Sequence, residues 1–200
     1  MKKLIYGVGI MDADYPVIKS INVAEAGRYK QKVIWKCPFY QTWWNILVRC
    51  YSAAEHKRLP SYIGCSISEE WKSFMVFRKW MLTQDWEGKQ LDKDLLFTGN
   101  KQYNKDTCIF VSPMVNKFIA DKSTSTKYPL GVAYFKQTNK LQAGCRNPFS
   151  KKREHLGLYE LSQEDLAHNA WKARKHKFAC ILADQQLDHR VADALKLKYK

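Results

Sequence analysis

The sequence predicts an α+β protein made of small modules, in which a strand–loop–strand–helix finger with flanking helices precedes a three-stranded antiparallel sheet packed on one helix. Apolar residues recur at helical spacing after Pro38, and three short β-prone runs follow one another between residues 130 and 160. The chain has 200 residues, of which 46% are hydrophobic, so it can bury enough surface to offset its folding entropy. This content excludes a disordered basic tail.

The net charge is strongly positive. The chain holds 34 Lys and Arg against 19 Asp and Glu, which gives a formal charge of +15. Like charges repel in the compact state, whereas they attract polyanions, and nucleic acid is the commonest partner of such a chain. Solubility, a membrane surface or an acidic protein partner are the alternatives. Residues 61–120 are nearly neutral, and their carboxylates stand beside amides, as a metal-dependent site requires.

The first half of the chain reads as loop and strand followed by helical scaffold. Residues 1–36 show no clear period, and Tyr-Gly-Val-Gly at 6–9 is interpreted as a turn. A helix starting at Pro38 places Tyr40, Trp43, Trp44 and Leu47 on one face. After a break at residues 59–64, a second helix is expected with Ser68 as its N-cap and with Glu69 and Glu70 in its first turn.

Residues 89–120 predict the layout of a ββα-metal finger. A strand over 90–96 and a β-prone run over 107–111 are separated by turn residues, and Ser112-Pro113 then starts a helix. Folding the hairpin against this helix would bring Asp92 or Asp94 near Asn116, giving oxygen ligands suited to Mg²⁺. The alternative for the charged Asp-Lys-Asp run is a solvated strand or turn.

The C-terminal part predicts a sheet with a covering helix. Three strands are expected over 130–136, 140–146 and 155–160, and a helix is expected to open at Ser162. A last amphipathic helix follows. The resulting organisation is an N-terminal strand and loop segment 1–36, a finger module 37–121, a linker 122–126, a sheet-plus-helix module 127–183 and a C-terminal helix 184–200.

The cysteines and the N-terminus indicate a reducing compartment. The N-terminal apolar run is broken by two glycines and by Asp12 and Asp14, so we expect no export, no membrane span and a cytoplasmic location. The six cysteines form no CxxC pair and are expected to be reduced, small and buried. The alternative is a structural Zn²⁺ held by Cys37, Cys50, Cys65 and Cys108, which the unpaired spacing disfavours.

Two separated patterns resemble known families. The first includes Trp44, Cys50-Tyr51-Ser52, Leu91-Asp92-Lys93-Asp94 through Gly99-Asn100-Lys101, Cys108 and Asn116, and it resembles phage HNH-type, homing-endonuclease-like proteins. The second includes Gly131-Val132, Lys140, Leu156-Gly157, Tyr159, Ala170-Trp171 and Lys175, and it resembles the ethylene-response-factor-type (APETALA-like) DNA-binding domain. In that domain a three-stranded sheet lies in the major groove of DNA and the helix braces it.

The resemblance implies metal-assisted phosphodiester hydrolysis in duplex DNA with Mg²⁺ or Mn²⁺, in a host cell's cytoplasm if phage-encoded, and with no small-molecule cofactor. Asp94 and Asn116 would hold the metal ion. The family's Asp-His pair aligns with Asp92-Lys93 or Lys93-Asp94, and no His lies in the finger. Lys93 would therefore act as a base or as a phosphate-binding cation. The implied catalytic residues are Asp92, Lys93, Asp94 and Asn116.

Three functions remain open from the sequence. The first is the endonuclease, the second is a non-catalytic, sequence-specific DNA-binding regulator with a degenerate finger, and the third is a basic protein that binds a host protein. In the first two, basic side chains on or near the strands contact phosphates or base edges. His155 is expected at a DNA contact or on the surface. The expected DNA-binding residues are Lys101, Lys136, Lys140, Arg146, Lys151, Lys152 and Arg153.

Overall fold

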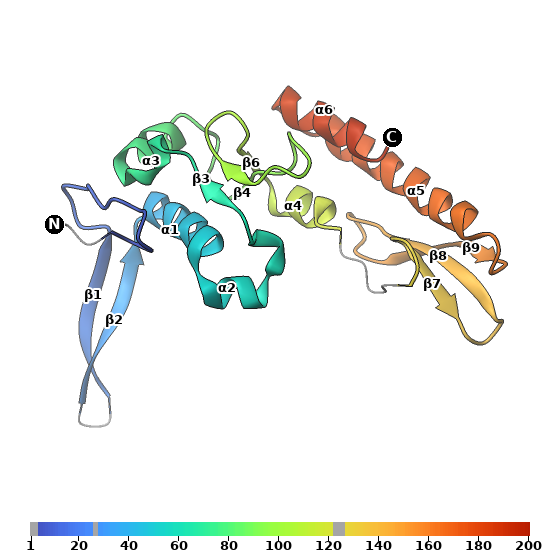
Figure 1. Ribbon diagram of the computed structural model, residues 1–200, viewed down its shortest axis with the longest axis horizontal. Coiled ribbons are helices and arrows are strands. Elements are labelled where there is room, and N and C mark those ends of the chain that lie inside the picture. The colour runs from blue at the N-terminus through green and yellow to red at the C-terminus, as the bar shows by residue number, and fades with distance from the viewer. Residues whose placement is uncertain (1–3, 26–27, 122–126) are drawn as a thin grey trace. The chain divides into compact units, whose positions relative to one another are not determined.

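The computed structural model describes residues 4–25, 28–121 and 127–200, and it confirms an α+β fold (Figure 1). The chain divides into two compact units, residues 1–110 and residues 111–200. Each unit has its own cluster of buried residues. Among the helices within the described ranges, none is both long and apolar enough to cross a membrane.

The N-terminal unit combines an antiparallel hairpin, short helices and two small strand pairs. Strand β3 pairs with β5 in parallel, and β4 pairs with β6. Its elements are β1 (Ile18–Glu25), β2 (Arg28–Lys36), α1 (Pro38–Tyr51), α2 (Ala53–Arg58), the 3₁₀ turn η1 (Pro60–Tyr62), β3 (Ser66–Ile67), the 3₁₀ turn η2 (Glu70–Lys72), α3 (Phe74–Met81), β4 (Gln90–Asp92), β5 (Gln102–Tyr103) and β6 (Ile109–Val111), whose last residue belongs to the second unit.

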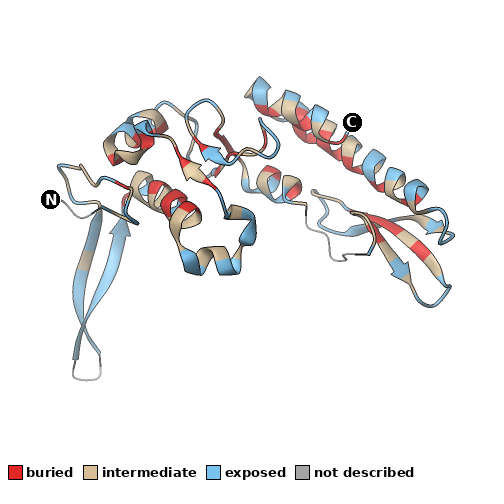
Figure 2. Ribbon diagram, viewed as in Figure 1, coloured by how far each residue is buried: buried red, intermediate tan, exposed pale blue. Residues whose placement is uncertain are grey.

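Helix α1 forms as its apolar spacing predicts and supplies the centre of this unit. Trp43 and Leu47 are fully buried, whereas Tyr40 and Trp44 are half-buried at the edge of the same face. The indole Nε1 of Trp43 donates a hydrogen bond of 2.7 Å to the carbonyl oxygen of Trp71, so the ring is buried without losing its polar partner. Figure 2 shows buried residues concentrated on the facing sides of α1 and α3.

The second helix begins later than the sequence predicts. Its N-cap is Ser73, whose Oγ accepts from the backbone N–H of Val76 at 3.2 Å, and the expected cap Ser68 lies outside it. The reason is a long-range hydrogen bond. The N–H of Ser68 donates to the carbonyl oxygen of Tyr103 at 2.9 Å, which extends the β3–β5 pairing and holds residue 68 out of helical geometry.

The C-terminal unit contains the predicted three-stranded antiparallel sheet packed on one helix. Strand β8 is central in the order β7–β8–β9, and residues Val132, Leu141 and Ala143 of the sheet form a buried cluster with Ala167 of the helix. The elements are α4 (Pro113–Ile119), β7 (Val132–Phe135), β8 (Lys140–Arg146), β9 (Arg153–Tyr159), α5 (Glu164–Asp184) and α6 (His189–Lys198).

Two element boundaries in this unit differ from the expectation. Helix α5 has Gln163 at its N-cap position and ends at Asp184, so the expected boundary at 183/184 lies in its last turn. The last helix starts only at His189, because the Asp188 side chain caps it by accepting from the N–H of Arg190 at 2.9 Å.

Helix α4 packs within the C-terminal unit through a buried lysine. Ser112 caps this helix as predicted, accepting from the N–H of Val115 at 3.2 Å. From α5, the Nζ of Lys175 donates to the carbonyl oxygen of Phe118 at 2.6 Å and pairs with Asp121 at 2.8 Å. The predicted module 37–121 is therefore divided, with residues 111–121 in the second unit. The predicted linker 122–126 lies outside the described residues.

We expect Asp121→Asn to lower the free energy of unfolding of the C-terminal unit by roughly 3 kcal/mol, because it leaves the buried ammonium of Lys175 without its counter-charge. Chemical denaturation followed by tryptophan fluorescence measures this change. The matched control is Asp184→Asn on α5, whose pair with Lys196 is mostly exposed and should contribute less than about 0.5 kcal/mol. Equal effects of the two substitutions would contradict the assignment.

Candidate functional site

The expected catalytic carboxylate Asp92 closes a turn at the end of β4. Its Oδ1 accepts hydrogen bonds from the N–H groups of Asp94 at 2.8 Å and of Leu95 at 2.6 Å. Burial raises the pKa of Asp92, and these two backbone donors act against that rise. One oxygen of this carboxylate is thus already used to shape the backbone that follows it.

Lys93 is buried and fastens the same loop, which contradicts the picture of a solvated charged run. Its Nζ donates to Asp94 Oδ1 at 2.6 Å and to the carbonyl oxygen of Asn100 at 2.7 Å. The Asn100 side chain returns a hydrogen bond of 2.9 Å to the carbonyl oxygen of Lys93. Two of the three N–H groups of this buried ammonium are thus engaged within the loop, so its geometry suits a structural role better than that of a general base.

One oxygen of each expected metal-binding carboxylate is already engaged. Asp94 Oδ1 pairs with the ammonium of Lys93, and Asp92 Oδ1 accepts from two N–H groups. Asn116 lies on α4 and therefore in the other unit, and its pairing with Asp94 stays a prediction. Within the described ranges, no group of three or more His, Cys, Asp or Glu residues could hold a metal ion.

The four cysteines considered for zinc are core residues. Cys37, Cys50, Cys65 and Cys108 are all buried in the cluster around Trp43. Burial raises the pKa of the Cys50 thiol to about 12, and Cys65 adds to this rise. Burial likewise raises the pKa of Cys108 to about 12. Within the described ranges, which include all four, no group of three or more His, Cys, Asp or Glu residues is placed to hold a metal ion, and the zinc alternative stays a prediction.

The outward face of the C-terminal sheet, on the side away from α5, collects cations. Alternation along β8 turns Leu141, Ala143 and Cys145 toward the helix and Arg146 outward. Arg146 lies directly opposite Arg153 of β9 in the antiparallel register, so both side chains occupy the same face. We call this surface the outer face; it carries Lys140, Gln142, Arg146, Arg153 and His155, together with the apolar side chains of Phe135 and Leu158.

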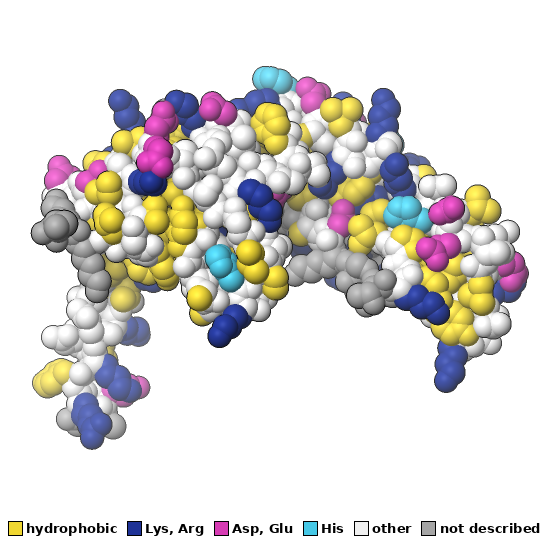
Figure 3. Space-filling view, viewed as in Figure 1, with side chains coloured by type: hydrophobic (Ala, Val, Ile, Leu, Met, Phe, Trp, Pro, Cys, Tyr) yellow, Lys and Arg dark blue, Asp and Glu magenta, His cyan; other side chains and the backbone are white. Residues whose placement is uncertain are grey.

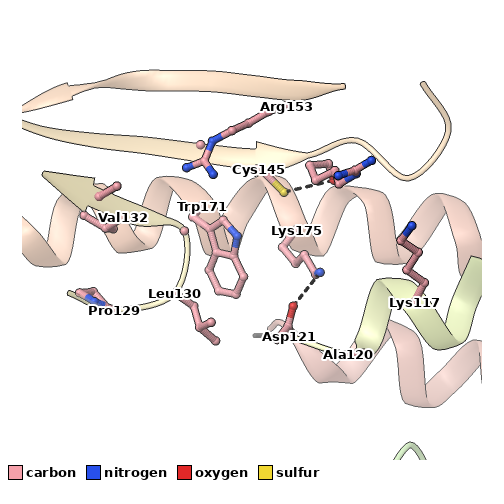
Figure 4. A pocket seen from close by; sticks show the side chains of 14 residues that line it. Lys117, Ala120, Asp121, Pro129, Leu130, Val132, Cys145, Arg153, Trp171 and Lys175 are labelled. Atoms are coloured by element: carbon pink, nitrogen blue, oxygen red, sulfur yellow. Dashed lines mark hydrogen bonds and ion pairs between the residues drawn. The ribbon is translucent and has the colours of Figure 1, made fainter. Parts of the chain in front are cut away.

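Arg153 crosses the sheet over a glycine. A Cβ atom at Gly144 would lie 2.6 Å from Arg153 Nε, so the glycine leaves room for this side chain against β8. Figure 4 shows Arg153 on one side of a pocket whose other side holds Trp171 and Lys175. The pocket has a volume of about 520 Å³ and is also lined by Lys117, Asp121 and Arg146. It is therefore basic at its rim, while the charge of Lys175 inside it is balanced by Asp121.

The acidic residue of the basic segment 151–155 faces the other way. Glu154 accepts from Arg174 of α5 at 2.9 Å and from the side chain of Asn147 at 2.8 Å. Its register partner is Cys145, which is buried on the helix side. The outer face consequently keeps its positive charge without a carboxylate beside Arg146 and Arg153.

The other expected DNA-binding residues have different surroundings. Lys136, Lys151 and Lys152 are exposed next to the strand ends, whereas Lys140 is paired with Glu160 at 2.6 Å. Lys101 lies in the N-terminal unit, where its Nζ donates to the carbonyl oxygens of Ser61 at 2.8 Å and Ile63 at 3.3 Å. Its role as a DNA contact stays a prediction, with the amine already engaged by the backbone.

One basic residue at this site was not expected from the sequence. Lys117 of α4 is exposed and lines the first pocket together with Arg146. It also lines a neighbouring pocket of about 390 Å³ with Met114, Pro148 and Lys151. No local pattern marks Lys117, because its place depends on α4 packing against α5 through Lys175.

The buried thiols should react slowly. At pH 8, well below the raised pKa values of Cys50 and Cys108, their thiolate fraction is very small, and burial blocks access to Cys37 and Cys65. We expect rapid modification at half-buried Cys180, with the five buried thiols, Cys145 included, reacting at least roughly 100-fold more slowly until denaturant is added. Cys180→Ser should remove the rapid phase. Stoichiometric zinc in the purified protein would contradict this description.

Comparisons with protein-family models, with curated proteins and with solved structures found no match for this chain.

Proposed function

We propose that this protein binds duplex DNA through the outer face of its C-terminal sheet. The observation that carries the proposal is the directly opposed pair Arg146 and Arg153, with Glu154 turned to the opposite side of the sheet. Like charges at opposed positions destabilise a sheet. A polyanion bound against this pair would offset the repulsion, because its phosphates would be attracted to both guanidinium groups.

The chemistry of the two arginines suits nucleic acid. A guanidinium can donate two parallel hydrogen bonds to a phosphate or to the O6 and N7 atoms of guanine. Exposed Lys136, Lys151 and Lys152 around the sheet would add phosphate contacts that position the duplex. The high positive charge of the chain would increase the rate of encounter with DNA.

DNA binding without cleavage is the form of the proposal that the geometry favours. The finger of the HNH-type resemblance needs a metal-binding carboxylate and an activating base, whereas Asp92 caps a turn and Lys93 is tied to Asp94 and Asn100. A DNA-binding regulator with a degenerate finger needs neither group. Cleavage, with Mg²⁺ or Mn²⁺ at Asp94 and Asn116, stays the alternative to be measured.

Neutralising the outer face should weaken DNA binding without harming the fold. We expect Arg146→Gln/Arg153→Gln to reduce the affinity for duplex DNA at least roughly 10-fold and to lower the salt dependence of binding by about two phosphate contacts. The melting temperature should be unchanged or slightly higher, because repulsion between the opposed cations is removed. Fluorescence anisotropy at several salt concentrations measures the affinity.

The control carries the same change in charge on the other side of the unit. Lys172 and Lys177 are exposed on α5, the helix that covers the inner side of the sheet. Lys172→Gln/Lys177→Gln should leave DNA affinity within about twofold of wild type. If both double variants lose affinity equally, binding depends on net charge alone and the outer face is not the interface.

A plasmid-nicking assay with Mg²⁺ and with Mn²⁺ separates binding from cleavage. We expect wild type, Asp94→Ala and Asn116→Ala to leave supercoiled plasmid equally intact, because Lys93 occupies the cation position at Asp94. Metal-dependent nicking by wild type that disappears in both variants would instead establish the endonuclease.

A further inference from the structure

Hairpin β1–β2 is an arm that the core of its own unit does not cover. Every residue of β2 is exposed, and in β1 all but one are exposed (Figure 2). Exposed apolar side chains include Ile21, Val33, Ile34 and Trp35. Exposed apolar surface of this kind commonly marks a site of interaction with another molecule. A two-stranded hairpin in water is only marginally stable by itself. The length and exposure of the hairpin therefore indicate that it binds another molecule rather than stabilises the core of its own unit.

The arm is fastened at its base. Val17 and Cys37 flank the hairpin and both pack in the N-terminal core, and the N–H of Cys37 donates to the carbonyl oxygen of Val17 at 2.8 Å. None of the described residues of β1 and β2 belongs to that core cluster. The two strands extend away from the helices of the unit (Figure 1). The core thus fixes where the hairpin starts and leaves its two faces open.

The two faces of the hairpin differ in charge. The antiparallel register places Ile21 opposite Lys32, Val23 opposite Lys30 and Glu25 opposite Arg28. A bulge between Lys19 and Ser20 shifts the register by one residue, so that Lys19 lies opposite Trp35. Opposed residues share a face, so one face carries cations along its whole length. We call this the basic face, and it consists of Lys19, Ile21, Val23, Glu25, Arg28, Lys30, Lys32 and Trp35.

The other face is mostly uncharged. It presents Ser20, Asn22 and Ala24 opposite Val33, Gln31 and Tyr29, and Lys36 opposite Ile18 is its one cation. On the basic face, Glu25 is the one carboxylate and is bound by Lys30 at 2.7 Å. Lys19 lies over the Trp35 ring at 5.5 Å from its centroid. Figure 3 shows Lys and Arg side chains along this hairpin.

We propose that the β1–β2 hairpin is a DNA-binding arm whose basic face lies in a groove of the duplex. Charge complementarity selects this occupant, because the basic face sets four cations against one carboxylate that is already paired. A two-stranded β-ribbon fits the major groove, which is about 12 Å wide. An eight-residue strand spans about 26 Å, so the cations can reach several successive phosphates.

The apolar side chains on this face do not form one continuous patch. Ile21 and Val23 stand opposite Lys32 and Lys30, so cations interrupt the apolar surface along the ribbon. This pattern disfavours a dry protein interface, which excludes charges from its centre. In a groove the same apolar groups can contact sugars and thymine methyl groups while the lysines reach phosphates.

The inference rests on the proposed DNA binding, and its test uses the full chain. We expect Arg28→Gln/Lys32→Gln to weaken duplex DNA binding roughly 10-fold near physiological salt and to reduce the slope of log affinity against log salt by about two. The control Lys57→Gln/Lys79→Gln removes the same charge from exposed positions of the same unit and should change affinity less than about twofold. If both double variants bind DNA with equal affinity, the proposal that the hairpin binds DNA is wrong.

A second variant removes the arm and keeps the core. Residues 18–36 are replaced by a short Gly-Ser turn between Val17 and Cys37, whose backbones are already hydrogen-bonded. We expect an unchanged melting temperature and a loss of DNA affinity at least as large as that of Arg28→Gln/Lys32→Gln. If removal leaves DNA affinity intact and changes the sedimentation of the protein from dimer to monomer, the occupant is a second copy and the proposal is wrong.

The outcomes distinguish this inference from the function on which it rests. If Arg146→Gln/Arg153→Gln weakens binding and the arm variants do not, the sheet binds DNA and the arm does not. If wild type shows no salt-dependent DNA binding at all, the proposed function itself fails.

Discussion

The C-terminal unit depends on burying one cation. Lys175 is surrounded by the rings of Phe118, Trp171 and Tyr199, and Asp121 supplies its counter-charge. Tyr199 donates to the second oxygen of Asp121 at 2.6 Å, and burial raises the pKa of this tyrosine well above its usual range. A buried charge is tolerated only when it is paired and hydrogen-bonded, so this contact fixes α4, α5 and the C-terminal end of the chain together.

A second buried lysine has the same effect in the N-terminal unit. Lys93 joins Asp94 to the carbonyl oxygen of Asn100 and so closes a loop between β4 and β5. Lys93 and Lys175 are the two buried charged residues within the described ranges. Both act on backbone carbonyls as well as on a carboxylate. Lys93, which the family resemblance places beside a catalytic metal, therefore has a structural role in this loop.

The basic charge of the chain is organised rather than uniform. Helix α5 covers one side of the three-stranded sheet and binds the carboxylate of Glu154, which leaves Arg146 and Arg153 on the open side. The hairpin repeats this arrangement, with four cations on one face and mostly uncharged side chains on the other. A polyanion is the partner that we propose for both surfaces. Each surface uses strand register, which sets the spacing of cations along the backbone.

The sequence alone determined what depends on neighbours in the chain. Helix α1, the Ser112 cap and the strands β7–β9 follow from apolar period, capping chemistry and β propensity, and all three agree with the structure. Only the tertiary structure decided that residue 73 rather than 68 caps α3 and that α4 belongs with α5. It also set Arg146 opposite Arg153. These features depend on hydrogen bonds and ion pairs between residues far apart in the chain, such as Ser68 with Tyr103 and Lys175 with Asp121. Local periodicity cannot predict them, because it reflects only residues that are close in the sequence.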